Sequence, residues 1–277
     1  MTRYTKLLAA VASGAALLLA GCTPGDPAGP SGNGGSGQAC ASAPKDTSFT
    51  KKRPVTVLIV DVSGSTKEQR ARGGQFENDW RMAACYTALN QGSLWATTAD
   101  SQTVADSLWM VRGKDFTPTF ADNPLLAEAE VRKQAEALAP QARQIVGSKK
   151  HSQSDLLGAL QVASRLFRDY PDRPRELVFL TDGGINAGGV NLGFDPPRTD
   201  AGRSKVISRL RAAGQLPDLT GGAGTPVRVW MGGLGHGVGG GDPRKTQALI
   251  ELWRSLIPAA HGELASDDSS LRLPDFP

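Results

Sequence analysis

Oxygen-bearing side chains follow two apolar stretches of the sequence, at the points where a strand would end. Asp61, Ser63 and Ser65 come directly after residues 55–60, and Asp182 follows a second apolar stretch. Successive side chains of an extended backbone point to opposite sides, so two serines spaced two apart can face the same ion. Mg²⁺ prefers oxygen ligands in a near-octahedral arrangement. These residues therefore indicate a site for a divalent cation, Mg²⁺ or Mn²⁺, between which oxygen ligands alone do not discriminate.

The same residues also have structural roles open to them. The hydroxyls of Ser63, Ser65 and Thr66 could cap a following helix, because an oxygen at the N-cap accepts a backbone N–H that the helix leaves unpaired. Asp182 precedes two glycines, a combination typical of a tight turn. On the sequence alone, both roles compete with metal ligation.

The spacing of apolar residues predicts alternating strands and helices from residue 54 onward. Short β-branched stretches such as residues 55–60 and 176–181 are typical of strands buried on both faces of a parallel sheet. Their alternation with amphipathic helices predicts a doubly wound α/β fold: a mostly parallel central sheet flanked by helices, with one antiparallel edge strand. In this fold, ligands bind at the carboxyl ends of the strands, near the topological switch point.

The remaining elements follow from the same spacing. A hairpin is expected at residues 94–98 and 108–112, a later strand at residues 227–231 and a last edge strand near residues 263–264. Helices are expected over roughly residues 67–90, 155–169, 203–213 and 243–256. Another helix should begin at Pro124, since proline suits the first helical position, and Pro140 should kink or divide it. Its core face is expected to contain Leu125, Leu126, Ala129, Ala135 and Leu138.

A strand followed by Asp-x-Ser-x-Ser at residues 61–65, and a later strand ending in Thr-Asp-Gly at residues 181–183, together resemble the metal-ion-dependent adhesion site (MIDAS) of von Willebrand factor A (VWA) domains. The resemblance extends in element order over about residues 54–265. It implies that the two serine hydroxyls ligate a cation directly, while Asp61 and Asp182 hold metal-bound waters. Because few anionic groups would touch the ion, it would stay electrophilic and accept a carboxylate from a partner protein.

The family also places a threonine just before a helix as a further ligand, often after glycines. The corresponding stretch here is residues 150–156, in which Ser154 aligns best and Ser152 stands in reserve. Serine keeps the hydroxyl that ligation needs, but the glycines are missing. A simple N-cap role for Ser154 is the competing interpretation.

The first residues have the pattern of an export signal. Two basic residues precede an apolar stretch over residues 7–20, which is shorter than the roughly 20 residues of a membrane-spanning helix and suits a signal peptide. Residues 19–22, Leu-Ala-Gly-Cys, resemble the bacterial lipobox. This resemblance implies removal of residues 1–21 and lipidation of Cys22 by diacylglycerol, with further acylation such as palmitate. An ordinary secretory signal that contains a cysteine is the alternative.

Residues 22–53 are rich in Gly, Ser and Pro, which predicts a flexible tether. The resemblance to VWA domains implies that residues 54–277 form the A domain. This organisation resembles bacterial, actinobacterial-like lipoproteins, which implies a domain anchored at the extracytoplasmic face of the cell membrane. In an oxidising compartment, two cysteines left besides a lipidated one most often pair. We therefore expect a Cys40–Cys85 disulfide, with two unpaired thiols as the alternative.

Other functions lack their sequence patterns. The chain has 31 basic and 27 acidic residues, and removal of residues 1–21, which include Arg3 and Lys6 and no acid, would leave 29 against 27. This near balance lacks the clustered basic stripe of a nucleic-acid binder. Residues 235–240 fit Gly-x-Gly-x-x-Gly, but the sheet's first crossover, where a dinucleotide site belongs, holds Asp61, so we expect a rim loop. Ser63 stands where a haloacid-dehalogenase-like phosphatase needs a second aspartate, and the segment lacks the Gly-x-Ser-x-Gly of a serine hydrolase.

The sequence thus predicts a non-enzymatic, membrane-anchored lipoprotein whose domain binds Mg²⁺ or Mn²⁺ and, through it, an acidic protein ligand. Residues 183–200 are longer than the usual 2–6-residue loop and should select that partner. The histidines His151, His236 and His261 lie in polar or glycine-rich segments and should be solvated. A metal-free scaffolding domain of an envelope complex and a metal-dependent hydrolase are the alternatives.

Overall fold

The computed structural model describes residues 40, 53–71, 74–99, 109–147, 153–186, 191–193, 195–220, 225–237, 242–268 and 271–273. The signal peptide, the lipidation of Cys22, most of the tether, Ser152 and His151 lie outside these residues, so those predictions stand as made. Among the described helices, none is both long and apolar enough to cross a membrane.

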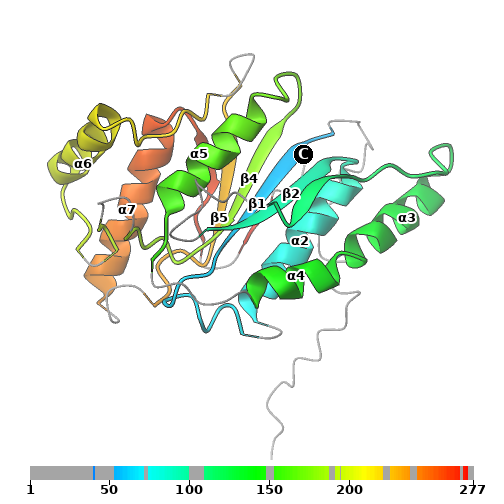
Figure 1. Cartoon of the computed structure of the whole chain (residues 1–277), viewed down its shortest axis with the longest axis horizontal. Helices are drawn as coiled ribbons and strands as arrows, with labels where there is room; N and C mark the ends of the chain where they lie inside the picture. The colour runs from blue at the N-terminus through cyan, green and yellow to red at the C-terminus, as the bar shows by residue number, and fades with distance from the viewer. Residues whose placement is uncertain are drawn as a thin grey trace, which may run out of the picture. The chain divides into compact units, whose positions relative to one another are not determined.

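The described strands form one six-stranded sheet in the order β3-β2-β1-β4-β5-β6 (Figure 1). All neighbouring strands run parallel except the β2–β3 pair. This arrangement confirms the predicted α/β doubly wound fold with one antiparallel edge strand. The strands are β1 (Val55–Asp61), β2 (Ser93–Ala99), β3 (Val111–Asp115), β4 (Arg175–Leu180), β5 (Arg228–Gly232) and β6 (Glu263–Ser266).

Helices cover both faces of the sheet, and the side chains of β1 alternate between two hydrophobic clusters. Leu58 and Val60 pack with the helices of one face, whereas Val57 and Ile59 pack with those of the other. Figure 1 shows α2, α3 and α4 on the first face and α5, α6 and α7 on the second. The helices are α2 (Gln75–Leu89), α3 (Pro124–Glu136), α4 (Ala139–Val146), α5 (Leu156–Phe167), α6 (Asp200–Ala212) and α7 (Pro243–Ala259).

Two predicted details of the helices are wrong. α2 begins at Gln75 rather than near residue 67, because residues 65–70 form turns that belong to the loop after β1. Of the predicted core face, Ala135 and Leu138 are buried, but Leu125, Leu126 and Ala129 are exposed. In their place, α3 buries Ala127 and Val131 together with Ala135. The division before Pro140 is confirmed, with α3 ending at Glu136 and α4 starting at Ala139.

The edge strands differ slightly from their predicted positions. The hairpin is confirmed by the antiparallel β2–β3 pairing, although β3 begins at Val111, later than the predicted residue 108. The short β6 is confirmed at the other edge, where it pairs in parallel with β5.

Cys40 and Cys85 form the predicted disulfide, with their Cα atoms 5.2 Å apart. Cys85 lies in α2, and the carbonyl oxygen of Cys40 accepts a hydrogen bond from Arg132 of α3. Both cysteines are buried. The bond therefore fixes residue 40 on the α2–α3 face of the domain.

Replacing both cysteines by alanine should lower the free energy of unfolding by about 3–4 kcal/mol, as the chain-entropy model gives for a closed loop of this length. The measurement is urea unfolding of the full chain, oxidised and reduced, beside the double variant. Reduced wild type should behave like the variant. Equal stability of all three samples would contradict the prediction.

Asp79 is a buried carboxylate of α2 whose Oδ2 atom has no hydrogen-bond partner in the described structure. Burial raises its pKa to about 6, against the opposing effect of hydrogen bonds from the Gln75 side chain and the Leu271 backbone. The folded state therefore favours protonated Asp79. Its stabilising contribution is complete below the ordinary pKa of 3.8 and is lost as the pH rises through about 6.

Asp79→Asn should therefore flatten the pH dependence of stability. As the pH rises from about 4 to about 8, the free energy of unfolding of the variant should rise relative to that of wild type by at most about 2–3 kcal/mol. Each unit of pKa shift corresponds to about 1.4 kcal/mol. Urea unfolding in EDTA across this range measures the difference. A constant offset between the two proteins would show that Asp79 does not titrate as described.

Candidate functional site

The predicted site residues meet where the order of the sheet reverses. The chain passes from β1 outward to β2 and then returns to pair β4 on the other side of β1, so the β1–β4 boundary is the topological switch point. Asp61 is the last residue of β1, and Asp182 lies two residues after β4. The structure thus places both aspartates where a doubly wound sheet binds its ligands.

Asp61 is fully buried, and both of its carboxylate oxygens accept hydrogen bonds. Oδ1 accepts from the Ser154 hydroxyl at 2.8 Å and from the Ser63 backbone N–H at 2.9 Å. Oδ2 accepts from the Thr181 hydroxyl at 2.8 Å. One carboxylate therefore joins three loops, and Thr181 is a site residue that we did not predict, although it stands directly before Asp182 in the recognised motif.

The loop after β1 brings two serine hydroxyls together. The Oγ atoms of Ser63 and Ser65 lie 3.0 Å apart, Ser63 buried and Ser65 exposed. Thr66 Oγ1 lies 2.9 Å from the Asp61 carbonyl oxygen, and Arg70 donates to the Ser63 carbonyl oxygen and to the Val146 carbonyl oxygen. Arg70 could not be predicted from the sequence, because an arginine that donates to backbone carbonyls has no fixed spacing from the motif.

The helix-capping interpretation of these hydroxyls is wrong. α2 begins at Gln75, and its N-cap is Gly74, which makes no side-chain capping bond. The hydroxyls of Ser63 and Ser65 therefore do not cap α2 and lie instead within hydrogen-bond distance of each other.

Ser154 is not the N-cap of α5 either. That role belongs to Asp155, whose side chain accepts the Gly158 N–H at 2.8 Å. The Ser154 hydroxyl instead reaches Asp61, and the Ser154 N–H donates to the side chain of Asn186. Asn186 belongs to the segment 183–200 that we expect to select a partner, and its side chain holds the loop before α5.

Asp182 forms the tight turn that is one of its two expected roles, and one of its carboxylate oxygens takes no part in that turn. Its Oδ1 accepts the Gly184 N–H at 2.8 Å in a tight turn. Gly183 has φ = 86°, and a Cβ there would lie 2.4 Å from Leu234 and 2.8 Å from Trp253, so only glycine fits. The second oxygen of Asp182, Oδ2, is buried and makes no hydrogen bond with the described residues.

Burial raises the pKa of both aspartates. For Asp61, desolvation exceeds the opposing effect of its hydrogen bonds from Ser63, Ser154 and Thr181. For Asp182, desolvation and then the charge of Asp61 raise the pKa to about 7, and the neighbouring Ser65 hydroxyl and the Gly184 N–H oppose this rise. Two carboxylates that are costly to ionise together form a site that a cation would stabilise, because its charge offsets both.

The donor set fits a hard cation. The set supplies only oxygen, which Mg²⁺ prefers. It consists of the carboxylates of Asp61 and Asp182, the latter with its unbonded Oδ2, and the hydroxyls of Ser63, Ser65 and Ser154. No group of three or more His, Cys, Asp or Glu side chains in the described structure could hold a metal. A cation here would therefore depend on serine hydroxyls and water in addition to Asp61 and Asp182.

The glycine-rich segment after β5 borders this site. The Gly235 N–H donates to the Asp182 carbonyl oxygen at 2.9 Å, and a Cβ on Gly237 would lie 3.1 Å from the Ser65 carbonyl oxygen. Its described part, residues 233–237, is thus a rim of the site, while residues 238–240 lie outside the described structure. His236 and His261 are both exposed, as expected.

No protein-family model matches the chain, and no curated protein matches it. Among solved structures, it is similar to the pilus adhesin SpaC from Lactobacillus rhamnosus GG in the open conformation, with 11% identity and a TM-score of 0.43 over 78% of this chain and 28% of the adhesin. It is also similar to an aerotolerance-related membrane protein from Bacteroides fragilis NCTC 9343, with 12% identity and a TM-score of 0.30 over 64% of this chain and 65% of that protein. The chain spans less than two thirds of either structure, and neither likeness bears on its function.

Proposed function

We propose that this chain is a membrane-anchored, extracytoplasmic lipoprotein with a VWA-type domain that binds Mg²⁺ or Mn²⁺ and, through the cation, an acidic protein ligand. The observation that carries the proposal is the meeting of two buried carboxylates and three serine hydroxyls at the switch point, with Asp182 Oδ2 buried and unbonded. An unpaired buried polar atom costs about 1–3 kcal/mol, and a bound cation with its waters would remove that cost.

The residues divide into two roles in this proposal. Ser63, Ser65 and Ser154 would ligate the cation through neutral hydroxyls, while Asp61 and Asp182 would orient its waters. A cation held by few anionic groups would supply an electrophilic position for a carboxylate of the partner. Ser65 is the exposed member of the set, so the partner would approach from its side.

We propose a binding domain rather than an enzyme. Ser63, where a phosphatase of the haloacid-dehalogenase type needs an acidic general acid, carries no proton donor of suitable pKa. His236 and His261, the histidines in the described structure, are exposed, and His261 lies beside Asp218 rather than beside a serine. This set supports ligand capture better than proton transfer.

One observation favours the second candidate, a metal-free scaffolding domain. Asp61 already accepts hydrogen bonds on both oxygens from Ser63, Ser154 and Thr181. These bonds tie β1, β4 and the loop before α5 together, which is a structural role that needs no cation. The two candidates differ in whether stability responds to Mg²⁺.

Thermal unfolding of the full chain should therefore shift upward in Mg²⁺ or Mn²⁺ relative to EDTA. Binding to the native state alone stabilises by about 2.7 kcal/mol at a hundredfold excess over Kd. Asp61→Asn and Asp182→Asn should lose this response. Asp79→Asn, which changes a buried carboxylate outside the cluster, should keep it. A wild type that melts identically in EDTA and in either cation, confirmed by direct titration, leaves the scaffolding role.

Two neighbouring substitutions separate ligation from capping. Ser154→Ala should weaken cation binding roughly tenfold, since it removes one hydroxyl ligand. Asp155→Ala should cost about 1 kcal/mol of stability through loss of the α5 cap and leave the cation Kd unchanged. Calorimetric titration and urea unfolding measure the two effects. If Ser154→Ala binds normally and Ser152→Ala does not, Ser152 is the ligand instead.

A further inference from the structure

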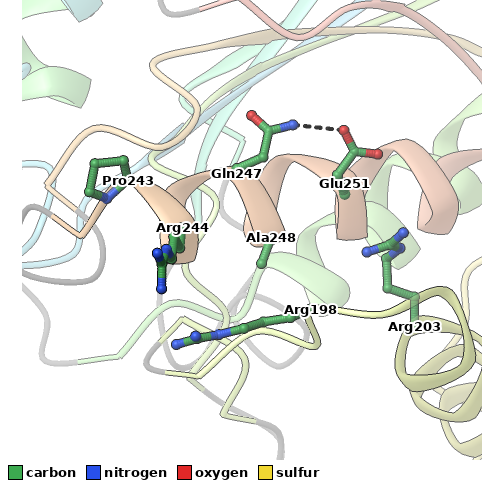
Figure 2. A pocket seen from close by; sticks show the side chains of 7 residues that line it. All are labelled: Arg198, Arg203, Pro243, Arg244, Gln247, Ala248 and Glu251. Atoms are coloured by element: carbon green, nitrogen blue, oxygen red, sulfur yellow. Dashed lines mark hydrogen bonds between the residues drawn. The ribbon is translucent and has the colours of Figure 1, made fainter.

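A hollow opens between the starts of α6 and α7, which follow β4 and β5 and so begin at the same edge of the sheet as the Asp61–Asp182 site. Its volume is about 380 Å³, within the usual range of ligand pockets. Figure 2 shows its lining, with two side chains from the α6 side facing those of α7. We call it the arginine pocket; its lining residues are Arg198, Arg203, Pro243, Arg244, Gln247, Ala248 and Glu251.

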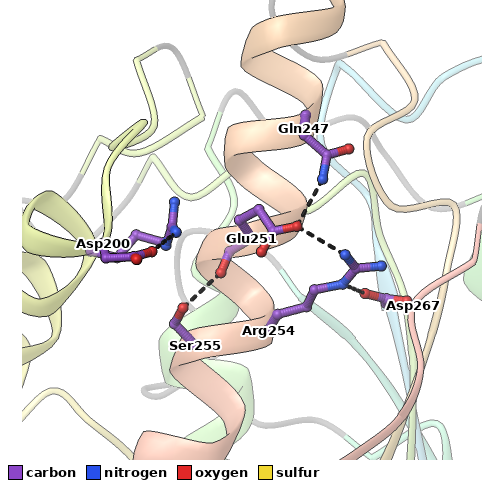
Figure 3. A network of polar contacts seen from close by, with 7 residues as sticks. Asp200, Gln247, Glu251, Arg254, Ser255 and Asp267 are labelled. Carbon is purple, nitrogen blue, oxygen red and sulfur yellow. Dashed lines mark hydrogen bonds and ion pairs between the residues drawn. The ribbon is translucent and has the colours of Figure 1, made fainter.

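Part of the charge in the arginine pocket is already neutralised. Arg203 pairs with Asp200 in the first turn of α6. Glu251, the one acidic lining residue, accepts hydrogen bonds from Gln247 and from Arg254, which also pairs with Asp267 (Figure 3). The carboxylate of Glu251 is therefore already paired with Arg254, which is not part of the pocket lining.

Arg198 and Arg244 are the two lining arginines whose charge is not neutralised by a described acidic side chain. Both are exposed, and neither forms an ion pair with an acidic side chain in the described structure. The nearby Asp242 is the N-cap of α7, and its carboxylate accepts a hydrogen bond from the backbone N–H of Arg244 rather than from the guanidinium group. Two guanidinium groups beside the apolar surface of Pro243 and Ala248 favour a carboxylate carried on a side chain, since arginine binds carboxylates through paired N–H groups.

The arginine pocket is connected to the Asp61–Asp182 site through two segments. The chain that leaves Asp182 leads to Arg198 at the start of α6. The rim, residues 233–237, touches Ser65 at one end, and a Cβ on Gly235 would meet Thr246 in the first turns of α7. The rim therefore borders both the Ser65 loop of the site and the first turns of α7 that line the arginine pocket.

We propose that the arginine pocket binds a second acidic side chain of the same protein ligand whose first carboxylate reaches the cation. The ligand is then a segment with spaced acidic residues rather than one with a single carboxylate. This inference rests on the proposed function for the first contact only, because Arg198 and Arg244 need no metal to attract an anion.

The test measures binding of a fluorescein-labelled hexaglutamate peptide to the full chain by anisotropy, in Mg²⁺ and in EDTA. The variant Arg198→Ala/Arg244→Ala should weaken binding about 3- to 10-fold in both buffers, as expected for two exposed charges. The matched control is Lys205→Ala/Arg209→Ala, which removes the same charge from exposed positions of α6 outside the pocket. The control should bind like wild type.

Equal losses in the two double variants would overturn the proposal, because net charge would then explain binding. Binding that needs Mg²⁺ but ignores Arg198 and Arg244 would also overturn it while leaving the cation site intact. Binding that depends on both arginines and ignores Mg²⁺ would support the pocket and refute the cation role. If phosphatidylglycerol vesicles, but not the peptide, bind through the two arginines, the pocket takes a lipid phosphate and the acidic-segment proposal is wrong.

Discussion

The hydrogen bonds to the buried Asp61 carboxylate determine how this edge of the sheet is built. A buried ionised carboxylate is tolerated only with several donors, and here the donors come from the loop after β1, from the end of β4 and from the segment before α5. Each bond fixes one segment in place. The serine hydroxyls, the turn at Asp182 and the Asn186 contact all take their positions from this arrangement.

The sequence predicted those elements of the fold that are buried on both faces of the sheet, and those set by a single residue such as proline or cysteine. The apolar stretches gave β1 and β4, and Pro140 marked the boundary between α3 and α4. The disulfide followed from counting cysteines. Leu125 and Leu126 were misplaced because their spacing fits an apolar stripe, while the actual α3 stripe of Ala127, Val131 and Ala135 is set by close packing against α2, a tertiary constraint that spacing alone does not encode.

The residues that belong to recognisable motifs could be predicted from the sequence. The residues that hold these motifs in place could not. Asp61, Ser63, Ser65, Ser154 and Asp182 come together as expected, whereas Thr181, Arg70 and Asn186 act through contacts between loops distant in sequence. Ser154 illustrates the difference. Two adjacent residues could both cap α5, and only the structure shows that Asp155 does so and leaves the serine for Asp61.

The Cys40–Cys85 bond also determines how the domain would carry a mechanical load. A pulling force on the chain before residue 40 enters the domain at Cys85, within a helix that packs along the sheet and against α3. β1, which is paired with β2 and β4 on its two sides, would not be the first element drawn out. Under the proposed function, tension between a lipid-anchored N-terminus and a captured partner would therefore cross the domain through α2 and the side of the sheet, rather than peel the strand that ends in Asp61.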